Sequence, residues 1–299
     1  MPPEAVPCHD ERTTAWWFLA PVLLCIGLFV ALPLLDTLAT SLMRDVSYLP
    51  RRFVGLGNYL RLSASPDLWQ GLRFTVWFAL AAVLLETLLG LVFALLLNER
   101  FRGRNWLRVV VLLPWVIPTI VSARTWRLLY DYSHGLINAV LTGTGLAATG
   151  VNWFGTPGSA FWAIVVADVW KTTPFVTLLL LAGLQAIPEE LYEQARVDGA
   201  GLWTRFRVIT LPLLRPVLLV AIVFRTIDSL RMFDLVFVLT GGGPGGATRT
   251  LSFIGFERFA SDDFGTGAAV SVITFLLSLA FTLIYLRVGR FRETLLAER

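Results

Sequence analysis

Charged residues, cysteine and histidine are all scarce in this sequence. Only 15% of its 299 residues are charged, whereas about 25% is usual in soluble domains. Two cysteines, Cys8 and Cys25, are too few for a disulfide framework or a cysteine-rich metal site. The two histidines are isolated, and neither an H-E-x-x-H motif nor a nucleophile elbow occurs. The sequence therefore offers no candidate catalytic or metal site.

The single lysine, Lys171, excludes one more class of site. A loop that cradles nucleotide phosphates follows the pattern G-x-x-x-x-G-K-[ST], in which the lysine reaches the phosphates. Lys171 instead follows Trp170 within an apolar segment. We therefore expect no cofactor in this chain, and any ATP-driven activity requires a separate ATPase chain that binds ATP and Mg²⁺.

Apolar residues are abundant, at 56% of the chain. A helix of roughly 20 apolar residues crosses the hydrocarbon core of a membrane, which is about 30 Å thick. We expect an all-α, polytopic membrane protein with six transmembrane helices in one membrane domain. The six spans are expected at residues 16–35, 72–97, 106–130, 160–186, 211–240 and 264–288.

The arginines indicate how the chain crosses the cytoplasmic membrane. Short cytoplasmic loops carry an excess of basic residues, and most loop arginines lie inside if both termini are cytoplasmic. We expect a cytoplasmic tail at 1–15, a membrane domain at 16–290 and a second cytoplasmic tail at 291–299. The uncharged stretch from Trp16 to Leu35 is longer than a usual signal core, so we expect a retained span, with a cleaved signal as the alternative. The net charge of +4 then reflects topology and not nucleic-acid binding.

The inner segment 187–212 predicts two short helices joined by a bend. Pro188 suits the first turn of a helix, and the acidic residues after it favour the positive end of the helix dipole. Gly199 and Gly201 interrupt that helix, and the spacing of Leu202, Phe206 and Ile209 predicts a second, amphipathic helix. From the residues alone, this segment is either a surface knob for docking or an ordinary connector.

The same segment resembles the E-A-A-x-x-D-G-A-(x)n-I-x-L-P loop of binding-protein-dependent ABC importer permeases. In that family the loop is the coupling helix that fits into the ATPase, and the resemblance implies a type I ABC importer permease fold. Gln194 departs from the pattern, since it replaces the first alanine. The implied ATPase-coupling residues are Glu193, Ala195, Asp198, Gly199, Ala200, Ile209, Leu211 and Pro212.

A second block, from Phe233 to Pro244, resembles the F-D-x-x-x-x-L-T-G-G-G-P segment of carbohydrate-importing permeases. That segment is typical of the subunit that pairs with a different permease. The resemblance implies a heterodimer, two ATPase subunits and an extracytoplasmic solute-binding protein as partners. Residues 169–175 and 225–228 look most like trehalose-type disaccharide permeases.

Several charged residues fall inside the expected spans, where an unpaired charge costs at least about 2.5–3.5 kcal/mol. Three pairs at i,i+3 could neutralise each other along one helix. They are Asp168 with Lys171, Arg225 with Asp228, and Arg231 with Asp234. These residues form either structural ion pairs or the polar lining of a hydrated path.

In sugar permeases the corresponding spans supply the central substrate pocket. Sugar hydroxyls exchange hydrogen bonds with charged and hydroxyl side chains, and aromatic rings pack on the apolar face of a sugar. The resemblance therefore implies a substrate path that contains Arg225, Asp228, Ser229, Met232, Trp170, Lys171, Thr172 and Phe175.

The favoured hypothesis is a permease subunit of an ATP-driven sugar importer, for a disaccharide such as trehalose or maltose. An ABC permease for another polar solute, such as glycerol phosphate, is an alternative. So is an ion-coupled secondary transporter that uses Glu86, Asp168 or Asp228, because intramembrane carboxylates often bind ions or protons. A third alternative is a membrane anchor or assembly subunit in which every buried charge is structural.

Overall fold

A computed structural model describes residues 11–297. Within this range, five helical segments are long and apolar enough to cross a membrane, and a bent pair of helices provides a sixth. The N-terminal segment consists of α1 (Glu11–Ile26), a π-helical turn at Gly27–Ala31 and α2 (Leu32–Ser41). The other long helices are α4 (Pro66–Asn98), α8 (Pro157–Gln185), α11 (Leu211–Leu230) and α14 (Phe264–Ala297). The expected all-α membrane fold is confirmed.

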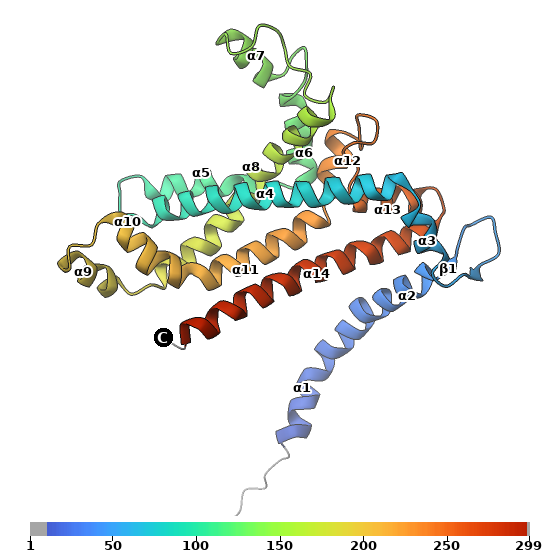
Figure 1. Ribbon diagram of the computed structural model, residues 1–299, viewed down its shortest axis with the longest axis horizontal. Coiled ribbons are helices and arrows are strands. Elements are labelled where there is room, and N and C mark those ends of the chain that lie inside the picture. Colours follow the sequence, from blue (N-terminus) through green and yellow to red (C-terminus); the bar gives the residue numbers. More distant parts are fainter. Residues whose placement is uncertain (1–10, 298–299) are drawn as a thin grey trace, which may run out of the picture.

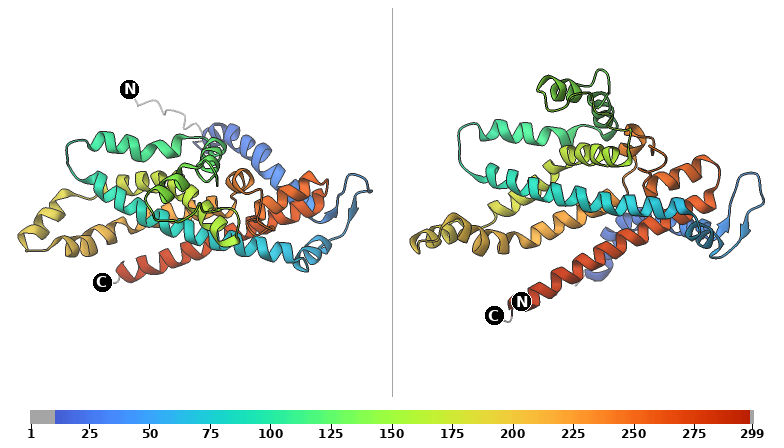
Figure 2. Two further views of the ribbon diagram at one scale, coloured as in Figure 1. Left: turned by 90° about the horizontal axis from the view of Figure 1, so that it is seen from above. Right: turned by 45° about the horizontal axis from the view of Figure 1, so that its top comes forward.

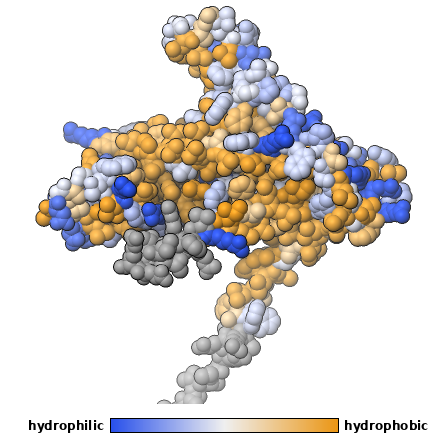
Figure 3. Space-filling model, viewed as in Figure 1, coloured by the Kyte–Doolittle hydropathy of each residue, from blue (hydrophilic) through white to orange (hydrophobic). Residues whose placement is uncertain are grey.

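Four long helices, α4, α8, α11 and α14, pack together as one bundle (Figure 1). Helix α4 packs along α8 and α11, and α11 also packs along α14. Helix α2 packs on α14, whereas α1 projects away from the bundle with its apolar side chains exposed. The flank of the bundle in Figure 3 is mainly hydrophobic, and hydrophilic residues gather at its two ends. This pattern is that of a surface facing lipid.

The third span is broken into α5 (Arg104–Val116) and α6 (Thr119–Leu129), which meet at 99°. Ile117 has an extended backbone (φ −70°, ψ 130°) because the ring of Pro118 disfavours helical geometry in the residue before it. The span expected at 106–130 is therefore present as a bent pair of helices and not as one continuous helix. Pro174, by contrast, lies within the continuous helix α8.

The fifth span differs from the expected 211–240 at both ends. It begins at Leu202, because α10 (Leu202–Arg205) continues through a π-helical turn at Phe206–Thr210 into α11. It ends at Leu230, and α12 (Asp234–Leu239) is a separate short helix. The hydroxyl of Thr250 donates a hydrogen bond of 2.8 Å to the carbonyl oxygen of Met232 in the break. Such side-chain bonds satisfy backbone groups that a helix would otherwise pair.

Short elements close the two ends of the bundle. At one end lie α9 (Glu189–Val197) and α10. At the other end are the antiparallel strands β1 (Met43–Arg44) and β2 (Arg52–Phe53), α3 (Gly57–Ser63) and α13 (Leu251–Ala260). Helix α7 (Leu136–Gly143) stands apart on an arm formed with α6, as the views in Figure 2 also show.

Close packing of α4 on α8 depends on Gly90. A Cβ atom at this position would lie 2.7 Å from Cγ1 of Val176 and 3.3 Å from the backbone nitrogen of Thr177. Val176 is itself fully buried. The two helices therefore approach each other at a distance that only glycine permits here.

We expect Gly90→Ala to lower the thermal stability of the purified protein, because overpacking a close contact costs about 1–3 kcal/mol. The matched control is Gly158→Ala in α8, where an added Cβ atom meets nothing within 4 Å. Thermal unfolding followed by tryptophan fluorescence measures both. Equal melting temperatures for the two variants would contradict the packing argument.

Candidate solute cavity and coupling loop

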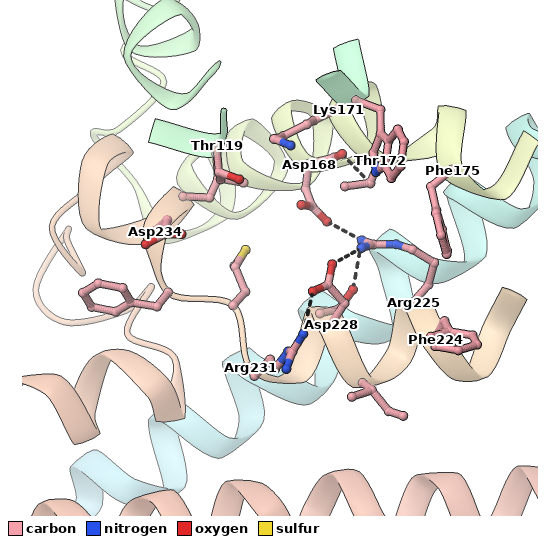
Figure 4. Close-up of a pocket in the computed structure, with 16 residues that line it drawn as sticks. Thr119, Asp168, Lys171, Thr172, Phe175, Phe224, Arg225, Asp228, Arg231 and Asp234 are labelled. Carbon is pink, nitrogen blue, oxygen red and sulfur yellow. Dashed lines mark hydrogen bonds and ion pairs between the residues drawn. The ribbon is translucent and has the colours of Figure 1, made fainter. Parts of the chain in front are cut away.

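A cavity of about 720 Å³ lies where both helix breaks meet the bundle (Figure 4). Helices α8 and α11 form two of its walls, the junction of α5 and α6 a third, and the start of α12 a fourth. Seven of the eight residues expected on a substrate path line it, the exception being Trp170. Those seven are Lys171, Thr172, Phe175, Arg225, Asp228, Ser229 and Met232.

Arg225 is the centre of the charged groups beside this cavity. Its side chain is buried and forms two hydrogen bonds with the carboxylate of Glu86 on α4, of which the one from Nη2 to Oε1 measures 2.8 Å. The same Nη2 lies 3.1 Å from Oδ2 of Asp168 on α8. One guanidinium group thus joins α4, α8 and α11. Two parallel hydrogen bonds to one carboxylate form the strongest kind of side-chain ion pair.

Further polar contacts complete this network. Arg225 also pairs with Asp228, and its Nη2 donates to the hydroxyl of Ser229 at 3.2 Å. The hydroxyl of Thr172 donates to Oε1 of Glu86 at 2.7 Å. Glu86 is fully buried, so each of its oxygens depends on these partners.

Of the three ion pairs expected at i,i+3, one is confirmed. Arg225 pairs with Asp228, but within residues 11–297 Asp168 pairs with Arg225 and not with Lys171. Arg231 pairs with Asp228 at 3.6 Å and not with Asp234. The last expectation is wrong because α11 ends at Leu230, so that Arg231 and Asp234 do not share a helix.

Two further cavity residues follow the two helix breaks, where Thr119 begins α6 and Asp234 begins α12. Thr119 was not predicted from the sequence, whereas Asp234 was one of the charged residues considered for the lining of a polar path. The aromatic rings of Trp115 and Phe175 lie 6.0 Å apart at one wall. Pro118 was the available signal for the residues at the first break, but a proline does not indicate on which side a neighbouring residue faces.

Trp170 lies outside the cavity. Its ring packs on Trp126 at 5.7 Å between centroids and lines an apolar groove on the other side of α8. At 100° per residue, Trp170 falls on the face of the helix opposite Asp168, Thr172 and Phe175. The helical periodicity within residues 168–175 was therefore the signal that separates it from the others.

The loop between α8 and α10 forms an exposed knob. Glu193 and Ala195 belong to α9, and Asp198, Gly199 and Ala200 form the turn after it. Gly199 has φ +76°, which glycine adopts readily, and the amide of Ala200 donates to the carbonyl oxygen of Ala195 at 2.8 Å. The remaining predicted coupling residues lie in the next helical segment: Ile209, Leu211 and Pro212.

Apolar side chains are exposed on both sides of this turn. Val197, Leu202 and Trp203 are each more than 70% exposed. A surface of this kind at the end of a polar loop is typical of a contact site for another protein. The two helices that flank the loop, α8 and α11, are also the two that carry Asp168 and Arg225.

Residues 86–293 match a protein family described as the binding-protein-dependent transport system inner membrane component. The chain belongs to this family. It is a permease, the membrane component of an ABC importer, and the family includes permeases of sugar transporters.

Two curated relatives are similar to this permease over nearly their whole length. The trehalose/maltose transport system permease protein MalF of Thermococcus litoralis is 55% identical, over 95% of this chain and 96% of the relative. The sulfoquinovosyl glycerol transport system permease protein SmoG of Agrobacterium fabrum is 38% identical, over 95% and 92%. A chain of a bacterial alginate ABC transporter, solved with a periplasmic protein that holds an alginate pentasaccharide, shares the fold with a TM-score of 0.80. That chain is 21% identical, and the match covers 92% of the permease and 93% of the solved chain.

We expect Arg225→Met to destabilise the permease by about 3–5 kcal/mol, because it leaves buried Glu86 without its cation. The double variant Glu86→Gln/Arg225→Met should recover part of this loss. Thermal unfolding of the two single variants and the double variant gives the interaction energy of the pair.

The control for this cycle is Arg231→Gln, which breaks an exposed pair worth less than about 1 kcal/mol. Strictly additive effects of the Glu86 and Arg225 substitutions would contradict a direct interaction between them.

Proposed function

We propose that this permease forms the path of an ATP-driven importer for a neutral disaccharide of the trehalose or maltose type. The observation that carries the proposal is the cavity, which combines a hydrogen-bonding floor with aromatic walls inside an apolar bundle. The 55% identity to a trehalose/maltose permease supports the choice of solute.

The cavity residues suit a polyhydroxylated solute. Lys171, Asp228 and Ser229 offer both donors and acceptors to hydroxyl groups, and Phe175 and Trp115 offer aromatic faces to the apolar side of a sugar ring. Arg225 is already occupied by carboxylates, so we assign it to holding Asp228 in place. The carboxylates that line the cavity also disfavour an anionic solute such as glycerol phosphate.

The assembly we propose follows from the resemblance to importer permeases. A second, different permease completes the path, two ATPase subunits bind ATP and Mg²⁺, and an extracytoplasmic protein delivers the sugar. Both termini and the knob at α9 then face the cytoplasm. Glu193, Ala195, Asp198, Gly199 and Ala200 enter the ATPase, while Ile209, Leu211 and Pro212 hold the knob against the bundle.

The continuity of the helices suggests how the ATPase acts on the cavity. Helix α8 enters the loop from one side, and the segment Leu202–Leu230 leaves it on the other. Closure of the ATPases on ATP would displace α9 and favour the outward-open arrangement of α8 and α11. Hydrolysis would restore the inward-open arrangement, from which the sugar enters the cytoplasm.

An ion-coupled secondary transporter fits the site less well. Glu86 and Asp168 are both held by Arg225, whereas an ion-binding or proton-binding carboxylate must exchange its partner during each cycle. Such a transporter also has no ATPase subunit for the exposed knob to contact.

Transport by the permease complex in liposomes tests the function directly. Uptake of radiolabelled trehalose or maltose should require ATP and the binding protein, stop with vanadate and survive a protonophore. Uptake that stops with the protonophore but continues with vanadate would support the secondary transporter instead.

We expect Gly199→Val to reduce ATP-driven uptake at least fivefold while the protein remains folded. A β-branched residue is strained at φ +76°, so the turn after α9 would change shape. The control is Gly201→Val, because Gly201 has φ −68° and open space around it. Equal ATPase activity and uptake in the two variants would contradict the docking argument.

We expect Asp228→Ala to lower uptake at least tenfold while the complex still assembles. Arg225 keeps Glu86 and Asp168 as partners in this variant, so the bundle retains its charge balance. Uptake and co-purification of the ATPase are measured on the same preparation. Parallel loss of both would assign Asp228 a structural role only.

A further inference from the structure

A basic cleft lies at the turn between α4 and α5. It has a volume of about 620 Å³ and is lined by residues 100–106. Arginines at positions 100, 102 and 104 contribute three positive charges, and Glu99 is the one acidic residue between Asn98 and Trp106. The cleft is therefore a concentrated site of positive charge at one end of the bundle.

Two of these arginines are free to bind a ligand. Arg100 pairs with Glu189 on α9 at 3.3 Å. In the part of the chain that the structure describes, neither Arg102 nor Arg104 has a carboxylate within ion-pair distance. Two neighbouring arginines whose N–H groups have no carboxylate partner suit a phosphate group, because a phosphate accepts several charge-assisted hydrogen bonds.

A second, apolar groove lies along α5, and its lining on that helix begins at Leu107, directly after the last residue of the basic cleft. The groove has a volume of about 620 Å³ and is formed by α4, α5, α6 and α8. On α5, Leu107 and Val111 follow Arg104 at i+3 and i+7, and both line the groove. Positions at this spacing share one face of a helix. The basic cleft and the groove are thus successive parts of one surface.

Aromatic side chains place the junction of cleft and groove at the membrane surface. Trp106 is 78% exposed and lines the cleft, and Phe101 is also exposed there. Exposed tryptophan is typical of the level of lipid headgroups. The positive charge therefore lies at headgroup level and the groove at the level of the acyl chains.

We propose that this surface binds one anionic phospholipid, with its phosphate at Arg102 and Arg104 and an acyl chain in the groove beside Leu107 and Val111. Charge complementarity and the continuous groove favour a lipid over a soluble phosphate, which would use the cleft alone. The site is independent of the transported solute. Through Arg100 and Glu189, the lipid would lie next to the proposed coupling helix.

The test is lipid binding to the full-length permease, purified in detergent with its partner chains and followed by native mass spectrometry. Phosphatidylglycerol should bind at one site per permease, and phosphatidylcholine should bind more weakly. Each basic residue near an anionic headgroup contributes about 1 kcal/mol, so Arg102→Gln/Arg104→Gln should weaken phosphatidylglycerol binding about thirtyfold. The charge-matched control is Arg52→Gln/Arg73→Gln at the other end of the bundle, which should change it less than twofold.

A second pair of variants tests the groove separately from the charge. Val110 lines the groove and its neighbour Val109 does not, although both are exposed. Val110→Trp should displace the lipid, whereas Val109→Trp should retain it, with melting temperatures showing that both variants fold.

Three results would overturn the proposal. One is equal binding of phosphatidylglycerol and phosphatidylcholine. Another is displacement of the lipid by millimolar inorganic phosphate, which would indicate a free-anion site. The third is a cross-link from Val110→Cys to a second chain in a complex that retains no lipid, which would show that a protein helix fills the groove.

Discussion

A buried arginine within an apolar bundle is the constraint on which the rest of this permease depends. Removing a charge from water costs several kcal/mol, and the cost is offset only by close, well-oriented partners. Arg225 finds them on three helices, with Glu86 from α4, Asp168 from α8 and Asp228 from its own helix. The positions of these helices relative to one another are therefore fixed by charge as well as by apolar packing.

The two breaks in the helices have a related consequence. A continuous span at 106–130 or 211–240 would present its polar residues at several levels of the membrane. The breaks at Ile117–Pro118 and at residues 231–233 instead bring Thr119 and Asp234 to the level of Arg225. A polar cavity thereby forms inside the bundle while its outer flank remains hydrophobic (Figure 3). Helices α8 and α11 both line this cavity and flank the α9 loop, so a displacement of the loop would act directly on two walls of the cavity.

The fold class, the six apolar segments and most of the residues named for the cavity could be predicted from the sequence. Long apolar runs predict spans, since no other arrangement satisfies their backbone in lipid. Seven of the eight expected path residues meet at one cavity because residues 3 or 4 apart share a helix face. Trp170, which the resemblance to sugar permeases placed in this set, lies outside the cavity, and the same periodicity assigns it to the opposite face of α8.

The features that the sequence did not predict all depend on contacts between distant segments. Nothing local indicates that Asp168 pairs with Arg225 in preference to Lys171, because Arg225 lies 57 residues away in the chain. The end of α11 at Leu230 is likewise accompanied by a hydrogen bond to Met232 from Thr250, the residue that precedes α13. Met232, Phe233 and the apolar run from Leu235 to Leu239 follow the end of α11, so average hydropathy extends the span to residue 240 despite Arg231 and Asp234.

The most direct test of a solute cavity at Arg225 is the accessibility of its lining. In a Cys8→Ala/Cys25→Ala background, Met232→Cys places a thiol in the cavity, and Leu80→Cys places one on an exposed, apolar flank of α4. A charged methanethiosulfonate reagent should modify the first but not the second in the membrane-embedded complex, and the transported sugar should slow that reaction. An unreactive thiol at position 232, or a rate that the sugar leaves unchanged, would contradict the account.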